Sequence, residues 1–138
     1  MSSGFFNIDY ISKLVSAQTE QTTSQPSDSF TINMVSGTSC DDVNPSAAGG
    51  TPADDTIYGT NNDDVMTGAG GNDDLFGCGG NDNIDGGDGN DNIDGGDGND
   101  NIFGGAGNDD ITGENGDDTI LAGDGNDNID GGNGNDNI

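Results

Sequence analysis

From residue 50 to the end of the chain, one nine-residue unit is repeated ten times in strict phase. Its fixed points are an aspartate and an apolar residue two positions later, and the residue before each aspartate is Asn or Asp. The aspartates are Asp55, Asp64, Asp73, Asp82, Asp91, Asp100, Asp109, Asp118, Asp127 and Asp136. A repeat held in constant phase predicts an array of similar structural units, each contacting its neighbours.

The composition indicates that such an array needs a source of stability other than apolar burial in order to fold. The chain has 27 acidic residues, one basic residue and no histidine, which gives a net charge of -26, and only 27% of its residues are hydrophobic. Composition alone favours disorder, because so little apolar surface cannot offset the conformational entropy that folding removes. The charge argues against binding to nucleic acid or to an anionic membrane, and it favours binding of cations.

The turn before each aspartate has the composition of a cation site. Regular repeats carry glycines five, four and two residues before the aspartate, such as Gly86, Gly87 and Gly89 before Asp91. Because glycine accepts positive φ angles, this turn can direct several backbone carbonyl oxygens toward one point, where the aspartate adds a carboxylate. Such an anionic, all-oxygen site suits Ca²⁺ better than Mg²⁺, and softer metals would require His or Cys ligands.

The residues after each aspartate predict a very short strand, whose middle side chain faces inward. Two units then make one coil of 18 residues, and stacked coils make two parallel sheets. The two inward ladders would be Ile57, Leu75, Ile93, Ile111, Ile129 and Met66, Ile84, Ile102, Ile120, Ile138. On the outside, Tyr58 would stack with Phe76 on one face and Phe103 with Leu121 on the other, as contacts for the N-terminal segment or another molecule.

Three segments carry a family resemblance: GGDGNDNID (86–94), GGDGNDNIF (95–103) and GGAGNDDIT (104–112). They resemble the nonapeptide GGxGxDxUx, with U apolar, of the repeats-in-toxin (RTX) family. The resemblance implies an all-β fold, a right-handed parallel β-roll (β-solenoid) of about five 18-residue coils. It also implies that Ca²⁺ lies between same-side turns of adjacent coils. The aspartates sharing one ion would be Asp82 with Asp100, Asp100 with Asp118, Asp91 with Asp109, and Asp109 with Asp127.

Matching the repeats to this pattern gives the candidate ligands. The carboxylates are those of Asp73, Asp82, Asp91, Asp100, Asp109, Asp118, Asp127 and Asp136. The backbone carbonyls are those of Gly77, Gly86, Gly87, Gly89, Gly95, Gly96, Gly98, Gly104, Gly105, Gly107, Gly113, Gly123 and Gly125. Up to about eight Ca²⁺ ions would bind per chain. Because the repeats hold 22 acidic residues and no basic one, ion binding would supply folding free energy, and the metal-free repeats are predicted to be disordered.

Several turns depart from the pattern. The first two turns lack the central glycines, which makes Asp55 and Asp64 weaker candidate ligands. Cys78 and Glu114 replace the second glycine of their turns, and Ala122 replaces the first glycine of its turn. We expect weaker ion binding at these positions.

Residues 1–49 form a separate N-terminal segment, and residues 50–138 form the repeat domain. Apolar spacing predicts a short helix over 5–15, a flexible linker over 16–29 and a short strand over 30–35. Neither a membrane span nor a secretory signal peptide is predicted. Cys40 and Cys78 are compatible with a disulfide or with two free thiols, and two cysteines are too few for a structural zinc site.

Enzymatic function is not predicted. Without histidine there is neither an HExxH zinc site nor a Ser-His-Asp triad, and GTSCD (37–41) lacks the second glycine of a nucleophile elbow. An EF-hand is excluded because Ile93 stands at loop position six, counted from Asp88, where that loop needs glycine. No small-molecule substrate is therefore expected.

Two functions remain. The first is a secreted, extracellular calcium-binding structural protein at a bacterial cell surface or in its matrix. It would fold on Ca²⁺ binding and self-assemble head-to-tail into a filament, matrix or surface layer, because the inward residue Ile138 is followed by no polar cap. The alternative is a soluble calcium-binding module that aids type I secretion or display of a larger protein.

Overall fold

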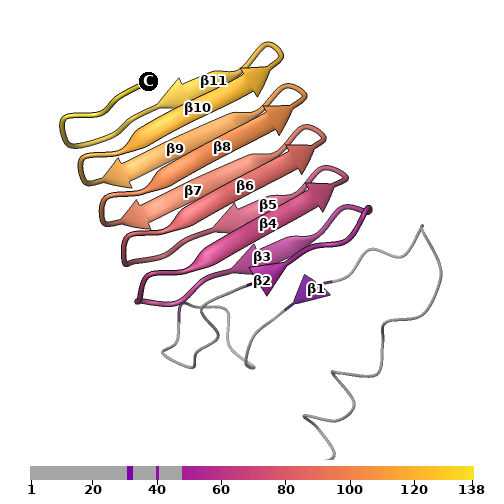
Figure 1. The fold of residues 1–138 in the computed structure, drawn as a ribbon, viewed down its shortest axis with the longest axis horizontal. Coiled ribbons are helices and arrows are strands. Elements are labelled where there is room, and N and C mark those ends of the chain that lie inside the picture. The colour runs from indigo at the N-terminus through magenta and orange to yellow at the C-terminus, as the bar shows by residue number, and fades with distance from the viewer. Residues whose placement is uncertain (1–30, 33–39, 41–47) are drawn as a thin grey trace, which may run out of the picture.

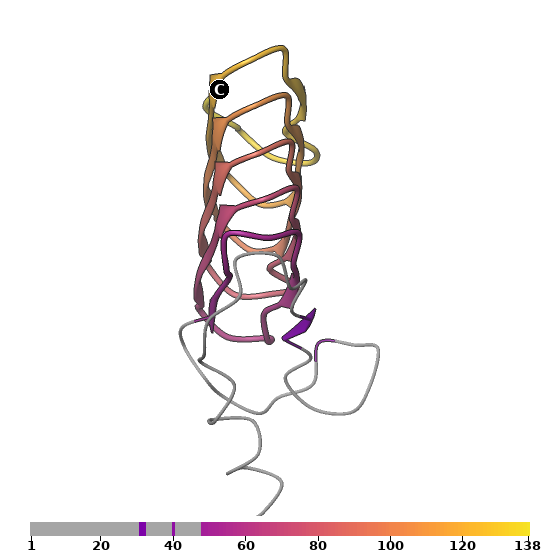
Figure 2. The same ribbon diagram turned by 90° about the vertical axis from the view of Figure 1, so that its right-hand side faces the viewer.

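The computed structural model of the chain describes residues 31–32, 40 and 48–138. In this part of the chain all regular structure is β-strand, in two parallel sheets that face each other (Figures 1 and 2). The first, here called the odd sheet, has the order β1 (Thr31–Ile32), β3 (Thr56–Tyr58), β5 (Asp74–Phe76), β7 (Asn92–Asp97), β9 (Asp110–Asn115), β11 (Asn128–Asp130). The even sheet has the order β2 (Ala48–Gly49), β4 (Val65–Gly70), β6 (Asn83–Asp88), β8 (Asn101–Ala106), β10 (Thr119–Asp124).

The repeat strands pair in parallel with strands one coil further along the chain. Leu75 of β5 pairs with Ile93 of β7, and Ile84 of β6 pairs with Ile102 of β8. The chain therefore alternates between the sheets and rises by one coil for every 18 residues, as Figure 2 shows from the side. This is the all-β parallel β-solenoid expected from the repeat.

The core is a single file of aliphatic side chains from each sheet. Eight inward residues are between 0% and 3% exposed: Ile57, Met66, Leu75, Ile84, Ile93, Ile102, Ile111 and Ile120. The predicted inward ladders are confirmed for these positions. In the last coil the prediction fails in part, because Ile129 is only partly buried and Ile138 is 69% exposed.

Most strands are longer than the sequence suggests. Three-residue strands were expected, but β6 to β10 have six residues each. The reason is that the glycine pair after the inward residue stays in register with the next coil, since Gly87 pairs with Gly105 and Asp88 with Ala106. The turn that bears the aspartate is correspondingly tighter.

A ladder of Asn and Asp side chains, here called the amide ladder, runs along both edges of the stack. The N–H of Asn90 donates to Oδ1 of Asn72 over 2.9 Å, and the N–H of Asn108 donates to Oδ1 of Asn90 over 2.7 Å. Their Nδ2 groups donate to the same oxygens over 3.1 Å. This explains why Asn or Asp precedes every repeat aspartate, a regularity whose cause the sequence alone did not reveal.

The predicted outward pairs also form. The rings of Tyr58 and Phe76 stack with centroids 4.8 Å apart, and Leu121 lies in register with Phe103. β1 lies within the range 30–35 where a strand is predicted, and its Thr31 pairs with Thr56. The rest of that range and the predicted helix over 5–15 lie outside the described residues. None of the described residues belongs to a helix able to span a membrane.

Candidate metal sites in the turns

Each repeat aspartate follows its turn, with its side chain directed into the stack. Eight of them are at most 4% exposed: Asp55, Asp64, Asp73, Asp82, Asp91, Asp100, Asp109 and Asp118. Asp127 and Asp136, in the last coil, are half-buried. Because a buried carboxylate is costly without compensating partners, the contacts of its two oxygens decide what the turn can bind.

The first oxygen, Oδ1, joins successive coils. The N–H of Asp91 donates to Oδ1 of Asp109 over 2.9 Å, and the N–H of Asp82 donates to Oδ1 of Asp100 over 2.8 Å. The same bond recurs at every repeat aspartate from Asp73 to Asp136. One oxygen of each of these carboxylates is thus engaged by the chain.

The second oxygen, Oδ2, is buried without a hydrogen-bond partner in six consecutive turns. These atoms belong to Asp73, Asp82, Asp91, Asp100, Asp109 and Asp118. Leaving a buried acceptor unsatisfied costs about 1–3 kcal/mol, and more when it is charged. Six such oxygens in a row mark six places where the chain presents a charged ligand without supplying its partner.

The first glycine of the turns before these six aspartates makes room for this oxygen. A Cβ atom at Gly95 would lie 2.6 Å from Oδ2 of Asp100 and 3.0 Å from the carbonyl oxygen of Gly113, one coil further along. At Gly86 it would lie 2.5 Å from Oδ2 of Asp91. The carboxylate oxygen and a carbonyl oxygen of the next coil therefore approach one small space, which is open only because the glycine has no side chain.

The turn glycines, the first one of each turn included, direct carbonyl oxygens between the coils. The turn glycines Gly87 and Gly89 have φ angles of 102° and 146°, which favour glycine. Among the predicted carbonyls, those of Gly77, Gly86, Gly95, Gly104 and Gly113 face the preceding same-side turn, and those of Gly87, Gly89, Gly98, Gly105 and Gly107 face the following one. The space between turns is thus lined with oxygen.

No group of three or more His, Cys, Asp or Glu side chains gathers at one point in the described residues. A turn contributes one carboxylate, so a metal ion there would need backbone carbonyls to complete its coordination. Ca²⁺ accepts six to eight oxygen ligands, carbonyls among them, whereas Mg²⁺ requires a tight octahedron and keeps several waters. The residues present fit Ca²⁺ on this ground.

Burial and the neighbouring carboxylates raise the pKa values of these carboxyls. Burial raises the pKa of Asp82 to about 7, and the neighbouring Asp100 and Asp64 carboxylates also raise it. Burial likewise raises the pKa of Asp73 and of Asp100 to about 6, with the adjacent aspartates adding to the effect. The pKa values of Asp91, Asp109 and Asp118 are raised for the same reasons. Without a cation the stacked carboxylates therefore resist ionisation.

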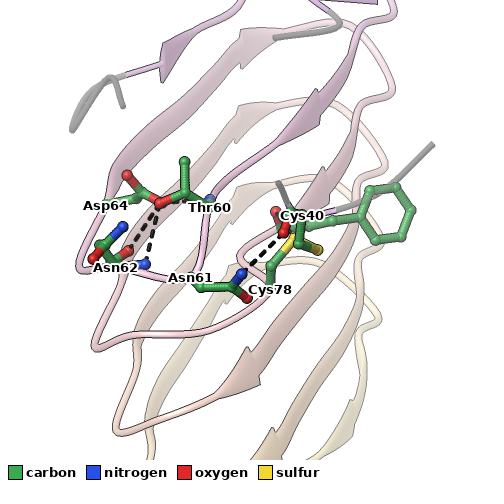
Figure 3. Close-up of a disulfide and its surroundings, with 7 residues drawn as sticks. Cys40, Thr60, Asn61, Asn62, Asp64 and Cys78 are labelled. Carbon is green, nitrogen blue, oxygen red and sulfur yellow. Dashed lines mark hydrogen bonds between the residues drawn. A yellow bond between two sulfur atoms is a disulfide. The ribbon is translucent and has the colours of Figure 1, made fainter. Parts of the chain in front are cut away.

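The first two turns differ. Oδ2 of Asp64 accepts hydrogen bonds from the N–H of Thr60 over 2.7 Å and from its Oγ1 over 2.9 Å. Figure 3 shows Thr60 beside Asp64, with its hydroxyl also bonded to Asn62. Oδ2 of Asp55 accepts the equivalent bonds from Thr51 over 2.5 and 2.9 Å. These two aspartates were expected to be weaker ligands because of missing glycines, but the sequence analysis did not identify the threonines as their partners.

Three turns keep the standard shape with a residue other than glycine at the second position. Ala69, Cys78 and Glu114 have φ angles of 77°, 81° and 70°. Their aspartates are buried and lack an Oδ2 partner, like those in regular turns. The substitution thus costs about 1–2 kcal/mol of backbone strain without reshaping the turn. Ala69 was missed by the sequence analysis, and weaker ion binding at Cys78 and Glu114 stays a prediction.

The two cysteines form a disulfide. Cys40 and Cys78 are joined with their Cα atoms 5.8 Å apart, which decides between the two alternatives that the sequence left open. Asn61 donates from Nδ2 to the carbonyl oxygen of Cys40 over 3.0 Å (Figure 3). Cys40 is therefore joined to the first coils by the disulfide to Cys78 and by this hydrogen bond.

Comparison with known proteins agrees with this geometry. The family model of the RTX calcium-binding nonapeptide repeat (4 copies) matches three overlapping segments, residues 49–84, 76–111 and 103–138. No curated protein and no solved structure matches the chain. The matched segments together span all ten turns.

Proposed function

The chain belongs to the RTX calcium-binding nonapeptide repeat family, and on this premise we propose that its turns bind Ca²⁺ and that the bound ions drive folding of the roll. One observation carries the proposal, namely the row of six buried Oδ2 atoms without hydrogen-bond partners. A cation between adjacent turns would supply the partner that each of these oxygens lacks.

The proposed ligands are the aspartates and turn carbonyls described above. An ion between two same-side turns would be held by both aspartates, so Asp100 would share one ion with Asp82 and another with Asp118. Asp109 would do the same with Asp91 and Asp127. Each ion would bring two positive charges into a repeat region that has 22 acidic residues and no basic one. Ion binding therefore contributes directly to the free energy of folding.

Calcium titration of the full chain tests this proposal. Far-UV circular dichroism should show a β-sheet spectrum at millimolar Ca²⁺, and excess EGTA should remove most of it. The same concentration of Mg²⁺ should not restore the spectrum, because the turns do not offer a compact octahedron. Identical spectra in Ca²⁺ and in EGTA would refute ion-driven folding.

We place this function outside the cell. RTX calcium-binding repeats are typical of secreted bacterial proteins, and the β-roll they form is a structural calcium-binding fold. The Cys40–Cys78 disulfide supports the same location, since disulfides persist in oxidising compartments. In calcium-poor cytosol the repeats would stay largely unfolded, and they would fold on meeting extracellular Ca²⁺. The chain would act as a structural protein rather than as an enzyme.

A second candidate function is head-to-tail self-association. β11 forms the edge of the odd sheet at one end of the stack, and in the even sheet Asn137 pairs with Thr119 of β10. An exposed strand edge can pair with another chain. Exposed Phe103 and Leu121 offer a separate, lateral contact on the even sheet. In sedimentation velocity experiments, Ca²⁺ should produce species larger than a monomer. A Leu121→Asp variant should retain them if ends rather than faces associate, and a monodisperse monomer would favour the soluble secretion or display module.

A further inference from the structure

We propose that Thr51 and Thr60 take the place of the cation in the first two turns, so that residues 48–82 form a calcium-independent cap at one end of the roll. The ion-dependent coils would be built on this cap. The claim that the later coils depend on ions rests on the proposed calcium binding, whereas the claim that threonine closes the first two turns does not. The proposal assigns six strong ion sites to the chain instead of the eight that the repeat count allows.

The hydrogen bonds of the first two turns compete directly with an ion. Oδ2 of Asp64 receives an N–H and a hydroxyl from the same residue, Thr60, which is itself 4% exposed. An ion at this oxygen would have to displace both donors, and the N–H would then point its positive end at the ion. Hydrogen bonds to a charged acceptor are about twice as strong as neutral ones, so losing these two bonds would oppose ion binding at this turn.

The backbone of these turns also differs from that of an ion site. In the next turn on the same side, Cys78 and Gly80 have φ angles of 81° and 112°, whereas neither Thr60 nor Asn62 has a positive φ. The N–H of Asn62 donates to Oγ1 of Thr60 over 3.1 Å, and the nearer of the two acceptors of that hydroxyl is Oδ2 of Asp64, at 2.9 Å against 3.5 Å for the carbonyl oxygen of Asn62. The threonine turn is thus a closed hydrogen-bonded unit.

Other contacts that need no ion converge on the same end of the roll. The disulfide joins Cys78 to Cys40, and the aromatic stack joins Tyr58 of β3 to Phe76 of β5. The cysteines are the chain's only two, and this ring stack lies in the first coils with them. Covalent, aromatic and threonine contacts therefore all support residues 48–82, where only Asp73 and Asp82 lack an Oδ2 partner, whereas every turn from Asp91 to Asp118 has a carboxylate without one.

Hydrogen exchange on the oxidised full chain tests the cap. In excess EGTA, amides of β3 and β5 should keep protection, and amides of β8 and β10 should exchange at least about a hundredfold faster than in Ca²⁺. Uniform loss of protection along the roll, or uniform retention, would overturn the proposal.

Two variants separate the roles of Thr60. Thr60→Val removes the hydroxyl and should speed exchange of β3 and β5 in EGTA by about tenfold, while the number of Ca²⁺ bound stays unchanged. Its matched control is Thr119→Val on the exposed side of β10, which should change neither quantity. The double variant Thr60→Gly/Asn62→Gly restores the glycines of a regular turn, and calorimetry should show one additional Ca²⁺ per chain.

The outcomes are distinguishable. An unchanged ion count in the double variant, or a lower count in Thr60→Val, would overturn the assignment of threonine as the substitute for the ion. A wild-type chain that binds no Ca²⁺ would end the proposed function, yet the comparison of Thr60→Val with Thr119→Val in EGTA would still decide whether threonine closes the turn. If Thr60→Val does not fold even in Ca²⁺, the double variant carries the test alone.

Discussion

The first two turns of the roll and the six that follow carry the same buried aspartate at the same spacing, yet they complete it differently. In the first two, a threonine donates two hydrogen bonds to Oδ2. In the next six, Oδ2 has no hydrogen-bond partner. The aspartate alone therefore does not define an ion site in this chain. The residue four positions before it decides whether the chain or a cation satisfies the carboxylate.

The largest difference should appear when an aspartate is neutralised in each region. Asp100→Asn removes charge from two proposed ion sites, and it should raise the Ca²⁺ concentration at the folding midpoint by tenfold or more, on the order expected when two binding contributions are lost. Asp64→Asn removes charge from a turn already closed by Thr60 and should shift the midpoint by about twofold or less. Calcium titrations followed by circular dichroism measure both. Equal shifts would erase the distinction between the two regions.

The second test uses pH in the absence of Ca²⁺. The pKa of Asp82 is about 7 in the folded chain, and those of Asp73 and Asp100 are about 6, all above the ordinary value of 3.8. Such groups stabilise the fold fully below the ordinary pKa, and this contribution is lost as pH rises through the folded pKa values. In EGTA, the central coils should therefore be more ordered at pH 4 than at pH 7.5.

With Ca²⁺ present the pH dependence should reverse, because protons compete with the ion for the same carboxylates. Calcium affinity should fall as pH drops below about 7, the folded pKa of Asp82. Exchange measured strand by strand would localise both effects to β6–β10. A metal-free chain that loses order on acidification would contradict the raised pKa values.

A smaller effect should follow from filling the space beside the unpaired oxygen. Gly95→Ala places a Cβ 2.6 Å from Oδ2 of Asp100 and should destabilise the calcium-bound roll by about 1–3 kcal/mol. Gly79→Ala is the matched control, since its Cβ would meet nothing closer than 3.6 Å. Urea denaturation at saturating Ca²⁺ compares the two. Similar losses would mean that the first glycine does not serve the carboxylate.

The smallest effect should come from the amide ladder, which runs through both regions. Asn90→Ala removes the acceptor for the N–H and Nδ2 of Asn108 and the amide donated to Asn72. These bonds are exposed, so we expect a loss of about 0.5–1.5 kcal/mol. Thermal denaturation in Ca²⁺ measures it. An effect as large as that of Asp100→Asn would mean that amides rather than ions hold the coils together.

Much of this arrangement follows from the nine-residue period, because a strict phase places every aspartate and every inward residue in a coil. The period does not predict which hydrogen bonds and covalent contacts complete each turn. Thr60 reads in the sequence only as a missing glycine, and its bonds to Asp64 depend on a backbone conformation that appears once the turn is built. The Cys40–Cys78 disulfide likewise depends on where the segment before the repeats meets the roll. The six-residue strands arise because Gly87 stays paired beyond the point where glycine usually ends a strand.

The similarity of the central coils has a consequence for which coils pair with each other. β6 and β8 carry the same inward isoleucine and the same glycine pair, so a pairing displaced by one whole coil would preserve their inward residues and amide ladders. The disulfide and the Tyr58–Phe76 stack are unique along the stack, and each joins particular neighbours. These contacts fix the register of coil pairing from one end of the roll. A chain without them would be prone to loop out a whole repeat pair, while the remaining coils kept normal pairing and inward residues.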